Sequence, residues 1–229
     1  MKHILVGFLF VLAFSFQSAA QMAMMNEKMT DKIVTPEDAA KRALTVGGKM
    51  PEFTLSDANG KKFSDKDLLK QGNLVIVFYR GAWCPFCNKY LHDLQEKLTE
   101  IKAAGGNLVA ISVENPDTSM KVSQKNKVAF TVLSDPKLMV ARKFGIVYEL
   151  DKTTNEKYIG YGVDLVKANG TEKPELPLSA TYIISKEGKI IYAYLEPDYK
   201  KRATPADLIK VLTEHKSAMM NKGMMKERN

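Results

Sequence analysis

Two apolar segments on either side of a patterned helix constrain the fold more than any other feature of this sequence. Residues 74–79 form an almost continuous run of strand-forming side chains, and residues 108–113 form a second run. Such runs are typical of strands buried on both faces of a sheet. Between them, apolar residues recur at alternating steps of four and three, which predicts a helix over residues 85–104. Strand, helix and strand in this order predict a parallel crossover and therefore an α/β fold.

The rest of the chain predicts a mixed sheet with helices on both faces. Hairpins are expected over residues 53–63 and 180–195, and a short strand over residues 130–133. Further helices are expected after the capping residues Thr35 and Thr204 (the latter over residues 205–214), and over residues 117–127 and 139–144. Residues 150–178 are polar and show no clear period, so they are predicted to form an irregular surface insertion.

The first twenty residues predict a secretory signal peptide. Lys2 and His3 precede the uncharged residues 4–16, and small residues follow up to Ala20. The apolar run is shorter than the ~20 residues that span a bilayer, so we expect cleavage near Ala20 and no integral membrane segment in the mature chain. The mature protein is therefore expected to be exported, either to a periplasm or to the medium.

The length of 229 residues suits a single domain with extensions. We expect a signal peptide at 1–20, an N-terminal extension with a short helix at 21–47, one domain at 48–215 and a Met- and Lys-rich tail at 216–229. The 34 Lys and Arg exceed the 26 Asp and Glu, for a net charge of +8. The basic residues are spread along the chain, which favours a solvated surface over a nucleic-acid partner. The sequence predicts no particular oligomeric state.

The two cysteines of the chain, Cys84 and Cys87, stand where the first buried strand meets the helix. Unpaired N–H groups and the helix dipole stabilise a thiolate in the first helical turn, which makes a cysteine reactive. Arg80 adds a positive charge if its side chain folds over the turn, while Trp83 is expected to pack beside the turn and Pro85 completes the motif. We therefore predict a redox-active dithiol, which requires that solvent reach the pair and that the two sulfurs approach each other.

Other uses of the pair fit less well. A disulfide closing so short a loop removes only about 2 kcal/mol of unfolded-state entropy. Haem attachment needs His after the second cysteine, where Asn88 stands, and zinc needs two further ligands in a chain with only three His. No metal or cofactor is therefore expected. A buried, inert thiol remains an alternative for Cys87, which lies on the apolar stripe.

The residues around the cysteines resemble the peroxiredoxin-like branch of the alkyl hydroperoxide reductase / thiol-specific antioxidant family. The resemblance covers about residues 47–212, and its main segments are residues 47–55, 78–87, 110–112, 133–136 and 141–145, with Asp198, Tyr199 and Arg202. It implies a thioredoxin-like fold and the reduction of hydrogen peroxide or organic hydroperoxides by a thiol. It also implies that a thioredoxin-like reductant returns the electrons.

The resemblance supports two registers for the cysteines. In the peroxiredoxin register, Cys87 is the peroxidatic cysteine and Cys84 resolves, which is the assignment we predict. Arg80 and Cys84 then replace the proline and threonine of the family motif, and the distant family arginine falls near Ser179. In the thioredoxin register, Cys84 attacks and Cys87 resolves, and the cis-proline that this superfamily places opposite the cysteines falls near Ser179, with Pro177 two residues away. Exposure alone also favours Cys84 as the attacking thiol.

Two other functions are kept as alternatives. The first is an exported thiol–disulfide oxidoreductase that acts on protein disulfides without peroxide. The second is a non-catalytic binding protein whose Met-rich tails hold Cu(I) through thioethers. Eight of the twelve methionines lie in those tails: Met22, Met24, Met25, Met29, Met219, Met220, Met224 and Met225. Near the motif, Phe78, Tyr79 and Phe86 are predicted to be core residues, whereas Lys89 and His92 are predicted to lie on the surface.

Overall fold

The structure is a computed structural model that describes residues 33–114 and 128–226, without the side chains of Lys222, Met225 and Lys226. The predicted signal peptide, residues 21–32 of the predicted extension and the helix predicted over residues 117–127 lie outside the described residues. Contacts group the chain from Val34 onward into one compact unit. Residues 34–47, which the sequence assigns to the N-terminal extension, therefore pack as part of the domain.

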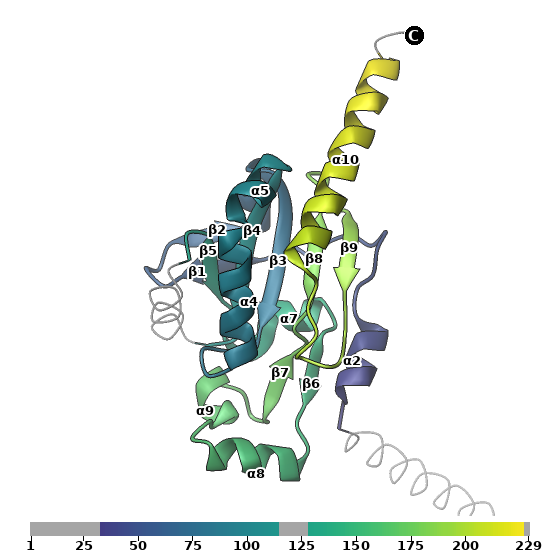
Figure 1. The fold of residues 1–229 in the computed structure, drawn as a ribbon. Coiled ribbons are helices and arrows are strands. Elements are labelled where there is room, and N and C mark those ends of the chain that lie inside the picture. The colour runs from purple at the N-terminus through teal and green to yellow at the C-terminus, as the bar shows by residue number, and fades with distance from the viewer. Residues whose placement is uncertain (1–32, 115–127, 227–229) are drawn as a thin grey trace, which may run out of the picture. The chain divides into compact units, whose positions relative to one another are not determined.

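A seven-stranded mixed sheet in the order β2-β1-β5-β4-β3-β8-β9 forms the centre of this unit (Figure 1). Its three parallel strands are β3 (Asn73–Tyr79), β4 (Gly106–Ser112) and β5 (Thr131–Ser134). The remaining strands run antiparallel to their neighbours: β1 (Thr54–Asp57), β2 (Lys62–Ser64), β8 (Thr181–Ile184) and β9 (Ile190–Tyr194). The predicted α/β class, the two hairpins and the parallel β3–β4 pair are confirmed.

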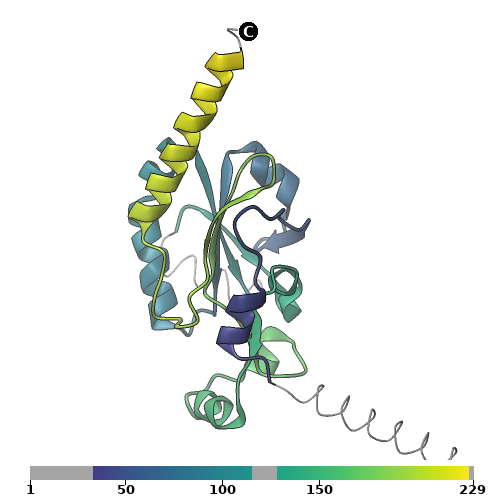
Figure 2. The same ribbon diagram turned by 90° about the vertical axis from the view of Figure 1, so that its right-hand side faces the viewer.

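Helices cover both faces of the sheet, as the view turned by 90° shows (Figure 2). One face carries α4 (Pro85–Glu96), α5 (Leu98–Ala103) and α10 (Pro205–Lys226); the other carries α2 (Pro36–Arg42), α3 (Asp65–Lys70) and α7 (Met139–Lys143). Along β3, successive side chains enter two separate core clusters: Leu74, Ile76 and Phe78 on one side, and Val75, Val77 and Tyr79 on the other. This alternation explains why the sequence of β3 is apolar throughout.

Side-chain caps fix where several helices begin. Thr35 and Asp38 form a capping box at α2, and Thr204 accepts from the backbone N–H of Asp207 at 3.1 Å at the start of α10. Both predicted caps are confirmed. Pro136–Leu138 forms a short 3₁₀ turn before α7.

Two predicted helix lengths are wrong. The helix predicted over residues 85–104 is broken at Lys97, whose φ of −99° and ψ of 7° separate α4 from α5. Both helices pack on the same core cluster, so the apolar pattern continues through the break and hides it. The last helix continues to Lys226 rather than ending at Glu214. The sequence prediction stopped too early because the outer turns of this helix are exposed and carry no apolar period.

The segment at residues 150–178 is not irregular. It contains α8 (Lys152–Gly160), α9 (Leu165–Asn169) and β7 (Glu175–Pro177), and β7 pairs antiparallel with β6 (Val147–Glu149). None of the residues of α8 is fully buried, so this helix lacks the apolar stripe that predicts a helix from sequence. The N-cap Asp151, which accepts from the Thr154 backbone N–H at 2.9 Å, starts it instead.

Within residues 33–114 and 128–226, no helix is both long enough and apolar enough to cross a membrane.

Candidate active site

The connection between β3 and α4 carries the cysteine motif at the carboxyl end of the parallel strands. Cys84 is the N-cap of α4, with an extended backbone (φ −88°, ψ 110°), and Pro85 begins the helix. The carbonyl of Cys84 accepts from the backbone N–H groups of Cys87 and Asn88, each at 3.1 Å. Proline suits this first position because its missing N–H would have no partner there. The predicted strand–turn–helix context of the two cysteines is confirmed.

Both cysteines are reduced and buried, each with 1% of its surface exposed. The prediction that the helix mouth leaves Cys84 open to solvent is wrong, because aromatic side chains cover it. Cys84 nevertheless forms part of the wall of a cavity of about 400 Å³, whereas Cys87 does not line it. The other lining residues are Arg80, Pro85, Val163 and the aromatic residues Trp83, Phe86, Tyr158, Tyr161 and Tyr199. A small molecule in this cavity would therefore meet the sulfur of Cys84 first.

Two arginines flank the sulfur pair. The Nη1 atom of Arg80 lies 4.0 Å from Sγ of Cys84, and Nη2 of Arg202 lies 3.4 Å from Sγ of Cys87. A hydrogen bond from the Cys87 side chain and the charges of the two arginines outweigh burial and lower the pKa of Cys84 to about 6. Burial and the hydrogen bond to Cys84 raise the pKa of Cys87 well above its usual value. The site therefore separates the pair into one thiolate and one thiol at neutral pH.

Aromatic rings hold Arg80 in place. Its guanidinium carbon lies 3.8 Å from the ring centre of Tyr199, 4.9 Å from that of Trp83 and 5.6 Å from that of Tyr158. Its Nη2 also donates a hydrogen bond to the hydroxyl of Tyr158. Ring faces attract a guanidinium, and this attraction grows when water is excluded. The side chain of Arg80 therefore lies over the turn, which meets the condition under which it adds a positive charge there, and Trp83 packs beside the turn.

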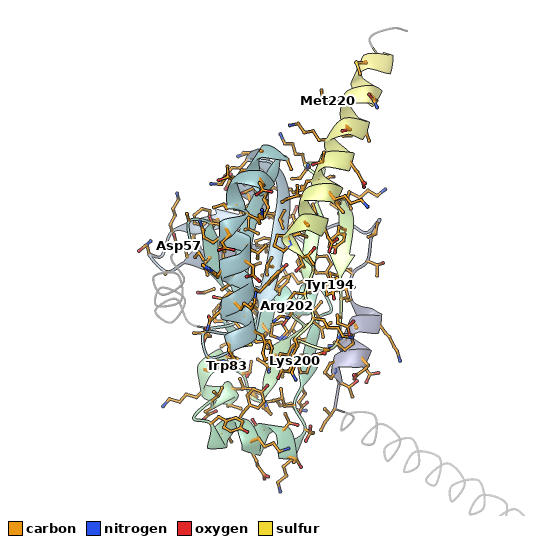
Figure 3. The ribbon with its side chains drawn as sticks, in the orientation of Figure 1. Asp57, Trp83, Tyr194, Lys200, Arg202 and Met220 are labelled. Atoms are coloured by element: carbon orange, nitrogen blue, oxygen red, sulfur yellow. The ribbon has the colours of Figure 1, made fainter. Side chains whose placement is uncertain are left out.

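Arg202 and Tyr158 are among the site residues that were not predicted from the sequence. Arg202, which is labelled in Figure 3, belongs to a short basic cluster whose sequence suggests a surface position. From the segment between β9 and α10, its Nη2 nevertheless reaches Sγ of Cys87. The one feature of the sequence that pointed to Arg202 was the family resemblance, which includes it together with Asp198 and Tyr199. Tyr158 gave no signal, because it lies in the segment predicted to be irregular. Neither contact can be inferred without knowing how these distant segments fold back on α4.

The position near Ser179 holds neither of the two groups that the two registers expect. Ser179 is buried, and its hydroxyl has no hydrogen-bond partner among the described residues. The described backbone contains no cis peptide bond, so the expected cis-proline is absent there. Arg202 supplies a positive charge beside the cysteines from a different part of the chain.

The prediction that Phe86 is a core residue is wrong, since it is 41% exposed. It follows Pro85 on the outer side of the first helical turn and meets Tyr199 edge to face, with ring centres 5.7 Å apart. Lys89 and His92 do lie on the exposed side of α4, where they pair with Asp93 at 2.7 Å and Glu96 at 3.5 Å respectively. Phe78 and Tyr79, by contrast, are confirmed as core residues, each with 1% of its surface exposed.

A buried carboxyl group just after the end of β4 supports the cysteine motif. Oε2 of Glu114 accepts from the backbone N–H of Ala82 at 2.7 Å and lies 3.4 Å from the Ser112 hydroxyl. Burial raises the pKa of this carboxyl above its usual value. Gly81 lies against it with a φ of +141°, and a Cβ there would meet the Glu114 carboxyl at 3.0 Å and Trp83 Nε1 at 2.5 Å. The loop before Cys84 is thus packed too tightly for any side chain at residue 81.

Within residues 33–114 and 128–226, no group of three or more His, Cys, Asp or Glu side chains is arranged to hold a metal ion. Of the predicted tail methionines, Met219, Met220 and Met224 are exposed on α10, and those at positions 22–29 lie outside the described residues.

Comparison with known proteins assigns this chain to a family. The model described as the AhpC/TSA family matches residues 46–193, which is more than half of the chain. The chain belongs to the AhpC/TSA family. The "Putative peroxiredoxin Rv2521" of Mycobacterium tuberculosis is 32% identical over 162 residues, covering 70% of this chain and 88% of that protein. The peroxiredoxin Bcp of Escherichia coli is 33% identical over 104 residues, covering 45% and 65% respectively.

The fold agrees with membership of the AhpC/TSA family. The crystal structure of the peroxidoxin BcpB from Mycobacterium tuberculosis matches with a TM-score of 0.58 at 21% identity, covering 74% of this chain and 96% of that one. The predicted thioredoxin-like fold is confirmed. In an AhpC/TSA chain, the cavity, the two arginines and the sulfur pair form a candidate active site.

Proposed function

We propose that this protein is a thiol-dependent peroxidase that cycles Cys84 and Cys87 between a dithiol and a disulfide. One observation carries the proposal: in a chain of the AhpC/TSA family, the two hydrogen-bonded sulfurs lie between Arg80 and Arg202, and one of them forms part of a cavity wall. The relatives named peroxiredoxins support the same reaction class.

The geometry favours Cys84 as the thiol that attacks peroxide. Cys84 lines the cavity and its pKa is lowered to about 6, while Cys87 lies deeper and its pKa is raised. Only the thiolate is nucleophilic, so the attacking residue must both be ionised and be reached by substrate. We therefore propose the order opposite to the one that the peroxiredoxin register predicts, with Cys87 as the resolving residue.

The chemistry then follows in three balanced steps. The Cys84 thiolate attacks one peroxide oxygen, an S–O bond forms, the O–O bond breaks, and the leaving alkoxide or hydroxide takes a proton. The Cys87 thiol, as it loses its proton, attacks the Cys84 sulfenic acid, the Cys84–Cys87 disulfide forms, and the sulfenic oxygen leaves as water. A dithiol reductant of the thioredoxin class then returns two electrons and two protons by thiol–disulfide exchange.

The charges around the pair assist this sequence. The guanidinium of Arg80 stabilises the Cys84 thiolate. Arg80 also lines the same cavity as Cys84, so its positive charge would stabilise the negative charge that develops on the leaving oxygen of a bound peroxide. Arg202 lies 3.4 Å from Cys87 and stabilises the negative charge that this deeper sulfur gains as it loses its proton. Burial of the site keeps these interactions strong because water does not screen them.

The test compares wild type, Cys84→Ser and Cys87→Ser with hydrogen peroxide and an organic hydroperoxide, in the presence of a thioredoxin system. We expect wild type to consume peroxide repeatedly and Cys87→Ser to react once, leaving a sulfenic acid on Cys84 that a sulfenic-acid probe captures. Cys84→Ser should carry no probe. Capture on Cys87 in the Cys84→Ser variant would instead establish the order that the peroxiredoxin register predicts.

The rival activity is tested in the same preparation. Rapid insulin reduction by the reduced protein, together with no peroxide consumption, would replace the peroxidase by a thiol–disulfide oxidoreductase.

We propose further that the protein acts outside the cytoplasm. Residues 1–20 have the basic start, the apolar middle and the small-residue end of a signal peptide. The N-terminal sequence of the protein recovered from its producing cells should begin near Gln21. Recovery of an intact Met1 in the cytoplasmic fraction would contradict export.

A further inference from the structure

Arg80 is a buried cation without a carboxylate partner in the described part of the chain. It is 2% exposed, and it forms none of the salt bridges found among residues 33–114 and 128–226. Its Nε has no hydrogen-bond partner there, so the guanidinium is held through Nη1, Nη2 and its faces. Burying an unpaired charge is costly, and the thiolate of Cys84 is the anion that Nη1 faces.

Tyr158 is the hydrogen-bond acceptor that fixes how this guanidinium is turned. Its hydroxyl accepts from Nη2, and its ring lies edge to face with Trp83, with centres 5.3 Å apart and planes at 85°. Tyr158 is half-buried, whereas most of α8 is exposed. The helix therefore contributes one side chain to the site, and that side chain contacts both the arginine and the indole that cover Cys84.

We propose that Tyr158 is a positioning residue, whose hydroxyl holds the Arg80 guanidinium in the orientation that makes it the counter-ion of the Cys84 thiolate. The inference rests on the proposed function only in taking Cys84 as the ionised thiol. It assigns a role to α8, which lies outside the cysteine motif and is joined to it only by the fold.

Other charged and titratable groups also face these atoms and must stay unchanged in the test. Cys87 on α4 and Arg202 from the segment before α10 act on Cys84, and Tyr148 of β6 and Tyr199 lie beside Arg80. Burial raises the pKa of the Tyr158 hydroxyl above its usual value, although the charge of Arg80 opposes this. Its influence therefore acts through the hydrogen bond and not through a charge of its own.

The experiment is a double-mutant cycle on the reduced protein. The thiolate of Cys84 is followed by absorbance at 240 nm between pH 4 and pH 8, and by the rate of iodoacetamide alkylation, in wild type, Tyr158→Phe, Arg80→Gln and the double variant. Tyr192→Phe on β9 is the matched control, because it makes the same chemical change away from the cavity. The phenyl ring of Tyr158→Phe keeps the packing on Trp83.

The expected result is a rise in the pKa of Cys84 by roughly 0.5 to 1 unit in Tyr158→Phe, which lowers the thiolate fraction at pH 5 by about three- to tenfold. Arg80→Gln should shift the pKa further, and adding Tyr158→Phe to it should have no additional effect. Tyr192→Phe should match wild type.

Three results would overturn the proposal. One is an unchanged pKa in Tyr158→Phe, and another is an equal shift with and without Arg80, which would mean that the hydroxyl does not act through the guanidinium. The third is loss of the folded state in Tyr158→Phe, which would give the hydroxyl a role in stability instead. The titration needs no peroxide, so a wild-type protein that fails to consume peroxide would refute the proposed function without deciding this one.

Discussion

The pKa of Cys84 makes the stability of the reduced protein depend on pH in a defined direction. The usual value of 9.0 falls to about 6 in the folded chain, a difference of about three units. Three units correspond to roughly 4 kcal/mol. At pH 7 about nine-tenths of folded molecules would carry a Cys84 thiolate, against about one-hundredth of the unfolded ones.

The direction in which the free energy of unfolding changes with pH follows from the number of protons that each state binds. Between pH 6 and pH 9 the unfolded chain keeps the Cys84 proton and the folded chain does not, so the free energy of unfolding rises with pH across this window. This contribution is lost as the pH falls through 6. The raised pKa of Cys87 acts in the other direction above pH 9, where the unfolded chain loses a proton that the folded chain retains. The thiol contribution should therefore be largest near pH 9.

The test compares the pH dependence of unfolding in wild type, Cys84→Ser and Cys87→Ser, all under reducing conditions. Urea unfolding of wild type at pH 6, 7, 8 and 9 should show a rise in the free energy of unfolding of up to about 4 kcal/mol. Cys84→Ser should remove most of this rise and also the thiolate absorbance at 240 nm near pH 7.

The Cys87→Ser variant shows which of the two sulfurs carries the thiolate. Cys87→Ser should keep part of the thiolate signal, because the positive charges of Arg80 and Arg202 remain while the hydrogen bond from Cys87 is altered. A flat pH profile in wild type, or a thiolate signal that survives in Cys84→Ser and disappears in Cys87→Ser, would refute the assignment.

Other substitutions test the packing around the site by urea unfolding. Gly81→Ala should lower the free energy of unfolding by about 1–3 kcal/mol because of its positive φ, and further because the new Cβ would contact Trp83. Gly188→Ala is the control, because Gly188 has a φ of +80° and no atom within 4 Å of a Cβ built there, so this variant measures backbone strain alone. Glu114→Ala should cost about 1–3 kcal/mol because it leaves the Ala82 N–H without its acceptor, and Glu114→Gln should cost less. Leu94→Ala, at a fully buried position on α4, should cost about 2–5 kcal/mol, and a loss below 1 kcal/mol would contradict the packing of α4.

The central elements were predictable because their patterns have one interpretation. The apolar runs that became β3 and β4 are buried on both faces, and the hairpin of β8 and β9 has a turn between two strand-forming segments. The predictions failed where a helix has no apolar stripe, as in α8 and the outer half of α10. They also failed where two helices share one stripe, as α4 and α5 do across Lys97.

The active site likewise contains residues that local sequence predicts and residues that only the tertiary structure brings in. Cys84, Cys87, Arg80 and Trp83 lie within eight residues, so the motif and its place at a helix start could be derived from local sequence. Arg202 lies 115 positions from Cys87 and Tyr158 lies 78 positions from Arg80, and no periodicity links such distant residues. Likewise, the burial of Cys84 could not be predicted, because Tyr158 of α8 and Tyr199 line the cavity beside it together with the nearby Trp83 and Phe86.

The sequence by itself determined the sheet, the helix that follows β3 and the presence of a dithiol at its first turn, since these depend on hydrophobic patterning and on backbone groups near in the chain. The tertiary structure decided which sulfur meets the cavity, which cations face the pair and how far water is excluded. Those properties arise from electrostatic and packing interactions between segments far apart in the chain, whose distances are set only when the whole domain folds.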